Sequence, residues 1–154
     1  SERIFVGLGS NLGDREGQIH AAVRAMGDLA GTRVVQVSPL RETLPWGVTE
    51  QPNFLNGVAE LRSSLEPEEL LRELKRIERE LGREVTYRWG PRMLDLDLLL
   101  FGERRLRTEV LNLPHPHILE REFVWGPLAE IAPEVVESLR DAALSLRSSG
   151  CDGE

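Results

Sequence analysis

Two aspartates two residues apart form the part of this sequence that is best suited to chemistry. Asp95 and Asp97 stand in a short, leucine-rich run, 94–101, that is typical of a buried strand. Because side chains two apart in a strand share a face, the two carboxylates should lie about 7 Å or less from each other. Such like charges repel and lose hydration, and an oxygen-ligated Mg²⁺ bridged to substrate phosphates would neutralise them. The alternative is a pair of solvated acids on an exposed strand face.

The apolar residues of this run favour the metal interpretation. The leucines at positions 94, 96, 98 and 100 fall on the face opposite the aspartates, while only Leu99 and Phe101 follow on the aspartate face. One face of the strand is therefore apolar and suited to a core. The other face has the two carboxylates at its N-terminal end.

An arginine-rich loop precedes the aspartates. Residues 83–92 contain three arginines and two aromatic residues, although the protein as a whole is acidic. Guanidinium groups grip phosphate oxygens in a fork, and aromatic rings pack on a base. Next to an acidic pair, the loop indicates a site for a magnesium nucleoside triphosphate. An ordinary solvated charged loop is the alternative.

Two further motifs carry weaker signals. His115 and His117 flank Pro116, but a third zinc ligand is missing. A histidine in a proline-rich turn is more often a hydrogen-bonding group at the surface or behind a site, yet an imidazole close to the arginine loop could donate to a phosphate. The glycine-rich segment 7–13 has neither the Walker lysine nor full dinucleotide-binding spacing. We interpret it as a structural turn between a strand and a helix.

The elements that must position these residues follow from hydrophobic periodicity. The expected strands are 4–9, 33–38, 54–61 and 94–101, and the expected helices are one between Asp14 and Gly31, 67–82, and a mostly helical 119–131. This order predicts an α+β fold with a ferredoxin-like βαββαβ core. Its mainly antiparallel sheet should be covered by helices in a three-layer α/β/α sandwich.

Composition limits the classes of function. With 154 residues, 40% of them hydrophobic, the chain fits a single domain, 1–154, and after Pro133 a helix-compatible stretch leads into a Ser/Gly tail, 146–154, expected to be disordered. A net charge of -7 argues against nucleic-acid binding. A single cysteine, Cys151, excludes an intrachain disulfide and suits a reducing compartment. The longest apolar stretch, 98–101, is far too short to span a bilayer, so we expect a cytoplasmic protein. The oligomeric state is not fixed by the sequence, and a monomer is our expectation.

Taken together, the motifs match a known family. The matching segments are Gly9–Gly13, Phe54–Asn56, Arg88–Arg92, Leu94–Asp97, Pro114–His115 and Arg121–Phe123. The chain resembles the 6-hydroxymethyl-7,8-dihydropterin pyrophosphokinases from about residue 4 to residue 133. The stretch from Arg88 to Asp97 is its most specific part.

The resemblance implies a transferase of folate biosynthesis. ATP would give its pyrophosphoryl group to the pterin hydroxymethyl group, and AMP would leave. Asp95 and Asp97 would hold two Mg²⁺ ions. By the same likeness, the catalytic residues are Arg83, Arg92, Asp95 and Asp97, and the ATP-binding residues are Glu78, Arg88, Trp89, Arg92, His115 and Arg121. Arg88 and Trp89 would belong to a loop that closes over the nucleotide.

The resemblance also implies a pterin site. The flat pterin would lie between Phe54 and Phe123, and its polar edge would meet the Asn56 amide. The backbone around Thr43, Leu44 and Trp46 would complete this edge. Stacking is nearly insensitive to ring substituents, so the amide and the backbone would provide selectivity. Without the resemblance, both phenylalanines would be assigned to the core.

Three departures from the family pattern bear on ligand binding. Phe54 replaces a common tyrosine, which preserves stacking, and Pro116 replaces a common aromatic residue. The loop after Gly82 is shortened, with Val85 near where a further arginine is expected. Nucleotide affinity would then be weaker or would depend on other residues.

Two other functions fit parts of the pattern. A non-catalytic ferredoxin-like binding module would not need paired strand aspartates in an acidic protein. A magnesium-dependent nucleotidyl transferase or nucleotide hydrolase would need the aspartates and arginines but not an aromatic pair with Asn56. Pterin binding separates this last class from the pyrophosphokinase.

Overall fold

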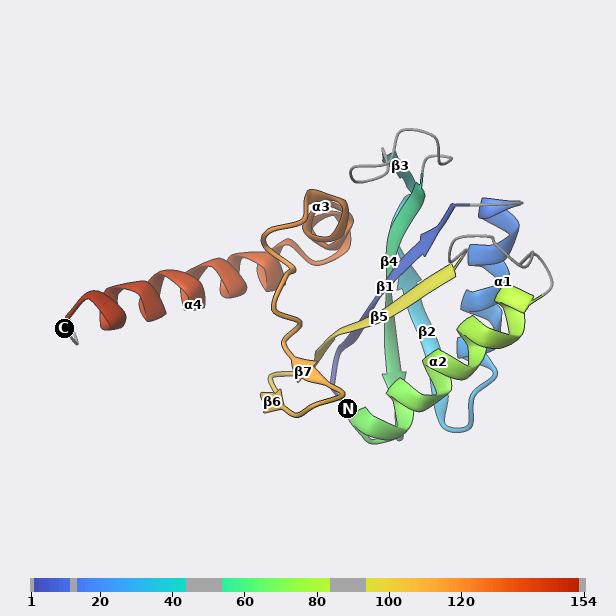
Figure 1. The fold of residues 1–154 in the computed structure, drawn as a ribbon, viewed down its shortest axis with the longest axis horizontal. Coiled ribbons are helices and arrows are strands. Elements are labelled where there is room, and N and C mark those ends of the chain that lie inside the picture. Colours follow the sequence, from blue (N-terminus) through green and yellow to red (C-terminus); the bar gives the residue numbers. More distant parts are fainter. Residues whose placement is uncertain (1, 12–13, 44–53, 84–93, 153–154) are drawn as a thin grey trace.

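The computed structural model describes residues 2–11, 14–43, 54–83 and 94–152. Within these ranges the chain forms two β-sheets and four helices, and the larger sheet lies between two pairs of helices (Figure 1).

The larger sheet is antiparallel and has β1 near its centre. β1 (Ile4–Ser10) pairs with β4 (Phe54–Ser63) on one side and with β5 (Leu94–Phe101) on the other. β2 (Thr32–Val37) and β3 (Arg41–Thr43) both pair with β4, so the order is β2-β4-β1-β5 with β3 beside β4. This is the strand order of a ferredoxin-like sheet, and the predicted fold is confirmed.

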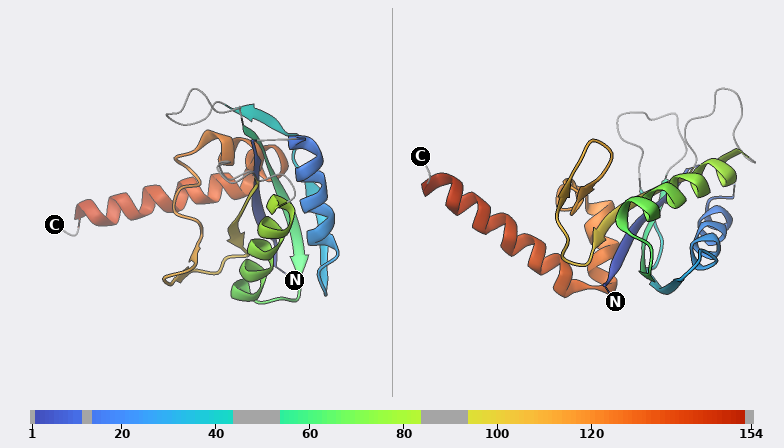
Figure 2. Two further views of the ribbon diagram at one scale, coloured as in Figure 1. Left: turned by 45° about the vertical axis from the view of Figure 1, so that its right-hand side comes forward. Right: turned by 90° about the horizontal axis from the view of Figure 1, so that it is seen from below.

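Helices cover both faces of this sheet. α1 (Arg15–Gly27) and α2 (Pro67–Arg83) lie on one face, while α3 (Glu122–Ile131) and the start of α4 (Pro133–Asp152) lie on the other (Figures 1 and 2). The arrangement is the expected three-layer sandwich. A small two-stranded sheet, β6 (Leu106–Arg107) with β7 (Asn112–Leu113), follows β5 and was not predicted.

Each sheet face has its own hydrophobic core. The face under α1 and α2 contributes residues such as Val6, Leu61 and Leu96, which pack with residues of both helices. The opposite face contributes Phe5 and Val58, among others, which pack with residues of α3 and α4. The central strand β1 is therefore buried on both sides, as its apolar sequence predicts.

Local signals set the helix starts as expected. Asp14 is the N-cap of α1, and its side chain accepts a hydrogen bond from the Gly17 N–H at 3.0 Å. Pro67 opens α2, where a missing N–H carries no cost. Gly31 follows α1 with a φ of 64°, a left-handed conformation that favours glycine.

One prediction about strand faces was wrong. A β-bulge interrupts the pairing of β5 with β1, because Val6 pairs with Leu98 while Phe5 pairs with Leu100. The extra residue, Leu99, shifts the alternation. Leu100 therefore packs in the core with Phe5, and Phe101 packs in the core beneath α1 and α2.

The C-terminal segment also differs from the prediction. Helix α3 begins at Glu122, and α4 continues as a helix through 146–152, where the Ser/Gly composition predicts a disordered tail. Strong helix formers such as Ala142 and Leu144 precede this segment and favour its continuation. In the described part of the chain, no helix combines the length and the apolar character that crossing a membrane requires.

Candidate functional site

The register of three strands brings the candidate residues to one face of the sheet. Gly9 in β1 pairs with Asn56 in β4 and with Asp95 in β5, and Gly7 pairs with Asp97. Directly opposed residues in neighbouring strands project to the same face. Asn56, Asp95 and Asp97 therefore project to one side, with the two glycines between them.

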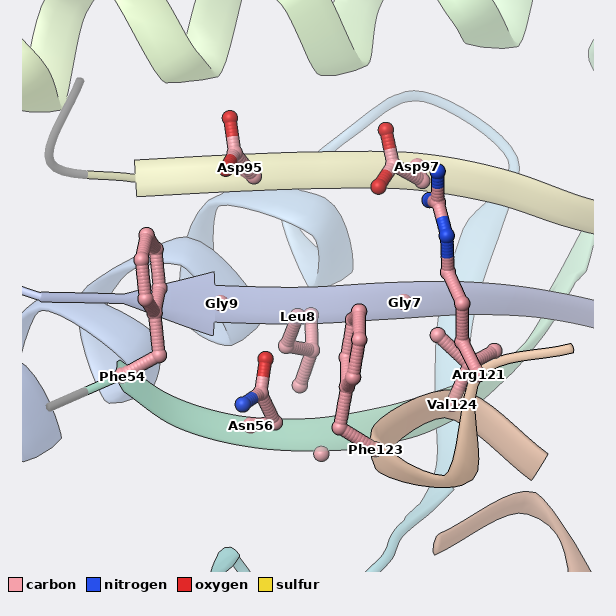
Figure 3. A pocket seen from close by; sticks show the side chains of 11 residues that line it. Gly7, Leu8, Gly9, Phe54, Asn56, Asp95, Asp97, Arg121, Phe123 and Val124 are labelled. Carbon is pink, nitrogen blue, oxygen red and sulfur yellow. The ribbon is translucent and has the colours of Figure 1, made fainter. Parts of the chain in front are cut away.

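A pocket of about 200 Å³ opens on this face (Figure 3). Six predicted site residues line it together with five others. The eleven residues are Gly7, Leu8, Gly9, Phe54, Asn56, Gly57, Asp95, Asp97, Arg121, Phe123 and Val124. Residues from three strands and from the start of a helix thus meet at one hollow, over the middle of the sheet.

The two aspartates stand side by side along β5. Both side chains project from the same side of the strand, toward the pocket (Figure 3). Each residue is partly buried, and the Asp97 side chain is 46% exposed. The carboxylates therefore line a concave site rather than a flat exposed face. Of the two interpretations left open by the sequence, this placement favours a cation site.

Two aromatic rings border the other part of the pocket. Phe54 comes from the start of β4 and Phe123 from the first turn of α3, and both are partly buried. Asn56 lies between them in Figure 3 and is only 6% exposed. These phenylalanines are not ordinary core residues. They face a hollow that also contains a buried amide.

The floor between these groups is formed by glycine. A Cβ at Gly9 would lie 3.2 Å from Asn56 Oδ1 and 3.9 Å from the Phe54 ring, whereas a Cβ at Gly7 would meet Leu99 at an ordinary 3.5 Å. The sequence interpretation of this segment as only a strand-to-helix turn missed this role. The signal that reveals it is the pairing of Gly9 with both Asn56 and Asp95, which needs the sheet register.

Arg121 brings a cation to the pocket. It is the residue immediately before α3, and its side chain extends toward the strand that carries Asp97 (Figure 3). A guanidinium there balances part of the carboxylate charge and presents hydrogen-bond donors.

His115 lies near the pocket but does not line it. Its backbone N–H donates to the Leu99 carbonyl at 2.8 Å, and its Nδ1 accepts from the His117 N–H at 3.2 Å. Burial lowers the pKa of His115; the charge of Asp97 opposes this shift, and the charge of Arg121 adds to it. The imidazole is therefore neutral at pH 7, with Nε2 as its N–H donor. His117 is exposed and pairs with Glu120 at 2.6 Å.

Glu78 does not line the pocket either. Its Oε2 accepts hydrogen bonds from the Leu96 N–H at 2.6 Å and from Lys75 Nζ at 3.1 Å. Its expected contact with ATP stays a prediction.

Several predicted site residues lie outside the described residues. They are Leu44, Trp46, Arg88, Trp89 and Arg92. Thr43 ends β3 and Arg83 ends α2, but the described residues include only their backbone. The structure therefore bears on the aspartates, the aromatic pair, Asn56 and Arg121, and not on the arginine loop.

Comparison with known proteins identifies the family. The family model of 7,8-dihydro-6-hydroxymethylpterin-pyrophosphokinase matches residues 5–133. The chain belongs to this family. It is 50% identical over 134 residues to a 2-amino-4-hydroxy-6-hydroxymethyldihydropteridine pyrophosphokinase of Pseudomonas aeruginosa, a match that covers 87% of this chain and 83% of the relative. Similar proteins of the same name occur in Bacillus subtilis, 46% identical over 138 residues (90% and 83% covered), and Methylorubrum extorquens, 42% identical over 153 residues (97% and 97% covered).

The matched range contains every residue of the pocket. Every residue that lines it falls between residues 7 and 124, inside the matched 5–133. Helix α4 begins at Pro133, where the match ends. The resemblance stated from the sequence motifs is confirmed, and it concerns the part of the chain that forms the sheet, α1, α2 and α3.

Proposed function

We propose that this chain transfers the pyrophosphoryl group of ATP to the hydroxymethyl group of 6-hydroxymethyl-7,8-dihydropterin and so makes AMP and the pterin diphosphate in folate biosynthesis. One observation carries the proposal: a single pocket combines two carboxylates with an aromatic pair and a buried amide. A simple nucleotide hydrolase would need only the carboxylates and the cations.

The pterin would occupy the part of the pocket between the aromatic rings. Phe54 and Phe123 offer two flat faces, and offset stacking contributes about 1 kcal/mol beyond area burial. Asn56, nearly buried, can present both a carbonyl and an amide to the polar edge of the ring. Ligands that leave this amide unpaired would be rejected, and the backbone around Thr43, Leu44 and Trp46 would add to the selectivity.

Asp95 and Asp97 fit a magnesium site. Carboxylate oxygens are the ligands that Mg²⁺ prefers, and it is usually held by one or two carboxylates, with substrate phosphates and waters as the other ligands. The described residues contain no cluster of three or more His, Cys, Asp or Glu that would form a complete protein cage. We propose that these aspartates hold two Mg²⁺ ions, which would neutralise phosphate charge when bound.

The phosphates would lie between the aspartates and the basic residues. Arg121 lines the pocket, and neutral His115 can donate from Nε2 without adding charge. By family resemblance, Arg83 and Arg92 would stabilise the transferring group. Arg88, Trp89 and Glu78 would contact the nucleotide. Together the arginines would compensate negative charge that develops on the phosphoryl oxygens.

Catalysis would rest mainly on positioning. The hydroxymethyl oxygen attacks the β-phosphorus in line, a new P–O bond forms, and the bond to the α-phosphate oxygen breaks, so that AMP leaves and the hydroxyl proton is lost. The rings and Asn56 would fix the pterin, while Arg121 and the Mg²⁺ that the aspartates would hold would fix the phosphates beside β5. Holding two reactants this way removes much of the entropic barrier.

An assay of products tests the proposal. Purified protein is incubated with ATP, Mg²⁺ and 6-hydroxymethyl-7,8-dihydropterin, and the products are separated by chromatography. Equal amounts of AMP and pterin diphosphate are expected, and they should disappear when EDTA removes the metal. ADP would indicate a simple kinase. Nucleotide hydrolysis that does not depend on pterin would contradict the proposal.

We also propose that the protein works as a monomer in the cytoplasm and that it acts on small molecules rather than on nucleic acid. The net charge of -7 supports the last point, because nucleic-acid affinity comes largely from phosphate neutralisation. Light scattering during size-exclusion chromatography should give one mass near 17.3 kDa.

A further inference from the structure

The outer edge of β5 is held by two side chains of α2. In the described sheet, β5 pairs with β1 on one side only. Leu96 stands opposite Leu8, and its N–H and C=O bond to α2: the N–H donates to Glu78 Oε2 at 2.6 Å, and the carbonyl accepts from Lys75 Nζ at 3.3 Å. Both backbone polar groups of one residue are thus satisfied by one pair of side chains.

The two side chains also bond to each other. Lys75 and Glu78 are three residues apart on α2, and their charged atoms lie 3.1 Å apart. The Glu78 side chain is only 10% exposed and the Lys75 side chain 37%. A nearly buried carboxylate needs such partners, since an unpaired one would be strongly disfavoured. We call Lys75 and Glu78, with their bonds to Leu96, the edge clamp.

The edge clamp acts at the residue between the two aspartates. Leu96 is joined by peptide bonds to Asp95 and Asp97, so the orientation of its peptide groups determines how the two carboxylates project. Lys75 Nζ also lies 4.0 Å from Asp97 Oδ1, so the clamp places a positive charge beside one carboxylate. An edge strand without such partners would be free to twist or to exchange its bonds with water.

Docking of the helix does not require the clamp. Leu74 and Ile77 lie beside Lys75 and Glu78 on α2 and are 0% and 1% exposed, in the core beneath the sheet. Burial of two such side chains fixes α2 on β5 without ionic groups. A buried carboxylate at this point therefore calls for a different explanation.

We infer that Lys75 and Glu78 are positioning residues for the transfer reaction: they hold the Leu96 segment of β5 so that Asp95 and Asp97 keep the relative placement that the metal and phosphates require. This inference rests on the proposed function and deepens it. It gives Glu78 a role through the strand that is separate from its expected contact with the nucleotide. Partners that orient metal ligands are worth about 10-fold to 100-fold in metal affinity or activity.

The first test measures the clamp without any ligand. Amide hydrogen exchange of Leu96 is followed by NMR in the full-length protein and in Glu78→Ala, Glu78→Gln and Glu80→Ala. In Glu78→Ala the Leu96 amide should exchange about tenfold faster or more, because a hydrogen bond to a charged group is lost. Glu78→Gln keeps an acceptor and should restore most of the protection.

Glu80 provides a matched control on the same helix. Its carboxylate is 59% exposed and pairs with Arg76 at 2.9 Å, away from β5. Glu80→Ala should leave Leu96 exchange and turnover unchanged.

The second test measures turnover. Glu78→Ala should lower kcat about tenfold or more and raise the Mg²⁺ concentration needed for half-maximal rate, with the KM for pterin within about twofold of wild type. Glu78→Gln should recover most of kcat. Lys75→Met, which keeps the apolar stem, should change kcat in the same direction as Glu78→Ala.

Each contrary result is decisive. Equal Leu96 exchange in wild type and Glu78→Ala would show that the clamp does not exist in solution. Faster exchange with unchanged kcat and Mg²⁺ dependence would make the clamp purely structural. Weaker ATP binding with unchanged exchange would assign Glu78 to the nucleotide. If wild type made no pterin diphosphate, the proposed function would fail, while the exchange experiment would still decide whether the clamp forms.

If Glu78→Ala failed to fold, the comparison of Glu78→Gln and Lys75→Met with wild type would take its place. Lys75→Met should reduce kcat more than Glu78→Gln does. The opposite order would overturn the inference.

Discussion

At the residue scale, the pocket depends on missing side chains as much as on those present. Gly7 and Gly9 occupy the strand between the amide of β4 and the aspartates of β5. A side chain at either position would project into the space where ligand groups must pass. Carboxylates, rings and amide can share one pocket only because the strand between them presents bare backbone.

Gly9→Ala should weaken pterin binding. The added Cβ would lie 3.2 Å from Asn56 Oδ1, so the amide would have to shift by a few tenths of an ångström. Overpacking of this kind costs about 1–3 kcal/mol, and we expect the KM for pterin to rise about tenfold. Steady-state kinetics at saturating ATP measures this. In Gly7→Ala the added Cβ makes an ordinary 3.5 Å contact with Leu99, so the KM for pterin should rise less. A larger rise in KM for Gly7→Ala than for Gly9→Ala would contradict the role of Gly9 as the floor of the pocket.

Asp97→Ala should abolish transfer while the fold stays intact. The residue is partly exposed and lies on the pocket face of β5, so its loss would remove a proposed metal ligand without opening a core. Circular dichroism should match wild type, and no AMP should form even in excess Mg²⁺. Turnover near wild type at saturating Mg²⁺ would refute the metal assignment.

By contrast, Asn56→Ala should mainly raise the KM for pterin.

At the element scale, β4 joins the pocket to a buried ionic network. One end of the strand carries Phe54 and Asn56. Further along, Glu60 is 2% exposed and bonds to Arg3 at 2.8 Å and to Gln36 at 2.8 Å. Gln36 also donates to the Ile131 carbonyl at the end of α3 at 3.4 Å. The network therefore fastens β2, β4 and the residue before β1 to the helix that supplies Phe123.

The stability conferred by Glu60 should depend on pH. Burial raises the pKa of this carboxyl, but hydrogen bonds from Arg3 and Gln36 and the charges of Arg3 and Arg62 lower it below its ordinary value. A carboxyl with a depressed folded pKa stabilises the protein above its unfolded pKa of about 4.3, and the benefit is lost as pH falls through the folded pKa.

Glu60→Gln should therefore cost about 2 kcal/mol at pH 7, and the difference from wild type should shrink below pH of about 4. Urea unfolding at several pH values measures it. Glu134→Gln is the control, because Glu134 is 61% exposed and lies 3.7 Å from Arg3, so it should cost about 0.5 kcal/mol or less. If the loss of unfolding free energy in Glu60→Gln did not change with pH, the proposed coupling between Glu60 ionisation and stability would be refuted.

At the scale of the whole molecule, the C-terminal part of α4 lies apart from the three-layer sandwich. The start of α4 packs on the sheet through Val135, Val136 and Leu139, and Arg140 lies 4.9 Å from the Trp125 ring centre. Beyond it the helix extends away from the body (Figures 1 and 2), and Leu144 is 60% exposed. The residues that line the pocket belong to the sandwich, and all of them precede α4 in the sequence.

Removal of residues 146–154 should leave both activity and stability unchanged. The deleted segment follows the part of α4 that packs in the core. Calorimetry should show a Tm within about 1 °C of wild type, because the core residues of α4, of which Leu139 is the last, precede the deletion. As a contrast, Val136→Ala truncates a core residue that is 2% exposed and should cost about 2 kcal/mol. Loss of transfer activity on deletion would show that the tail contributes to the site.

The sequence by itself determined the main strands and helices of the sandwich and the shared face of the two aspartates. Alternating and helical periodicities are local properties of the sequence. The boundaries of the strand 94–101 and the start of α1 at Asp14 were therefore predicted correctly. The order of the predicted elements then led to the ferredoxin-like topology. The spacing of Asp95 and Asp97 placed both carboxylates on one face for the same reason. Phe54 and Phe123 were assigned to the pterin only by family resemblance.

Only the tertiary structure decided which distant residues meet. Phe54 and Phe123 border one hollow because α3 packs on β4, and Gly9 became the floor because the sheet register sets it between Asn56 and Asp95. The hydrogen bonds from α2 to Leu96 depend on how a helix docks on the edge of a strand. Such contacts join segments far apart in the chain, and they are fixed by register and packing, which local periodicity does not encode.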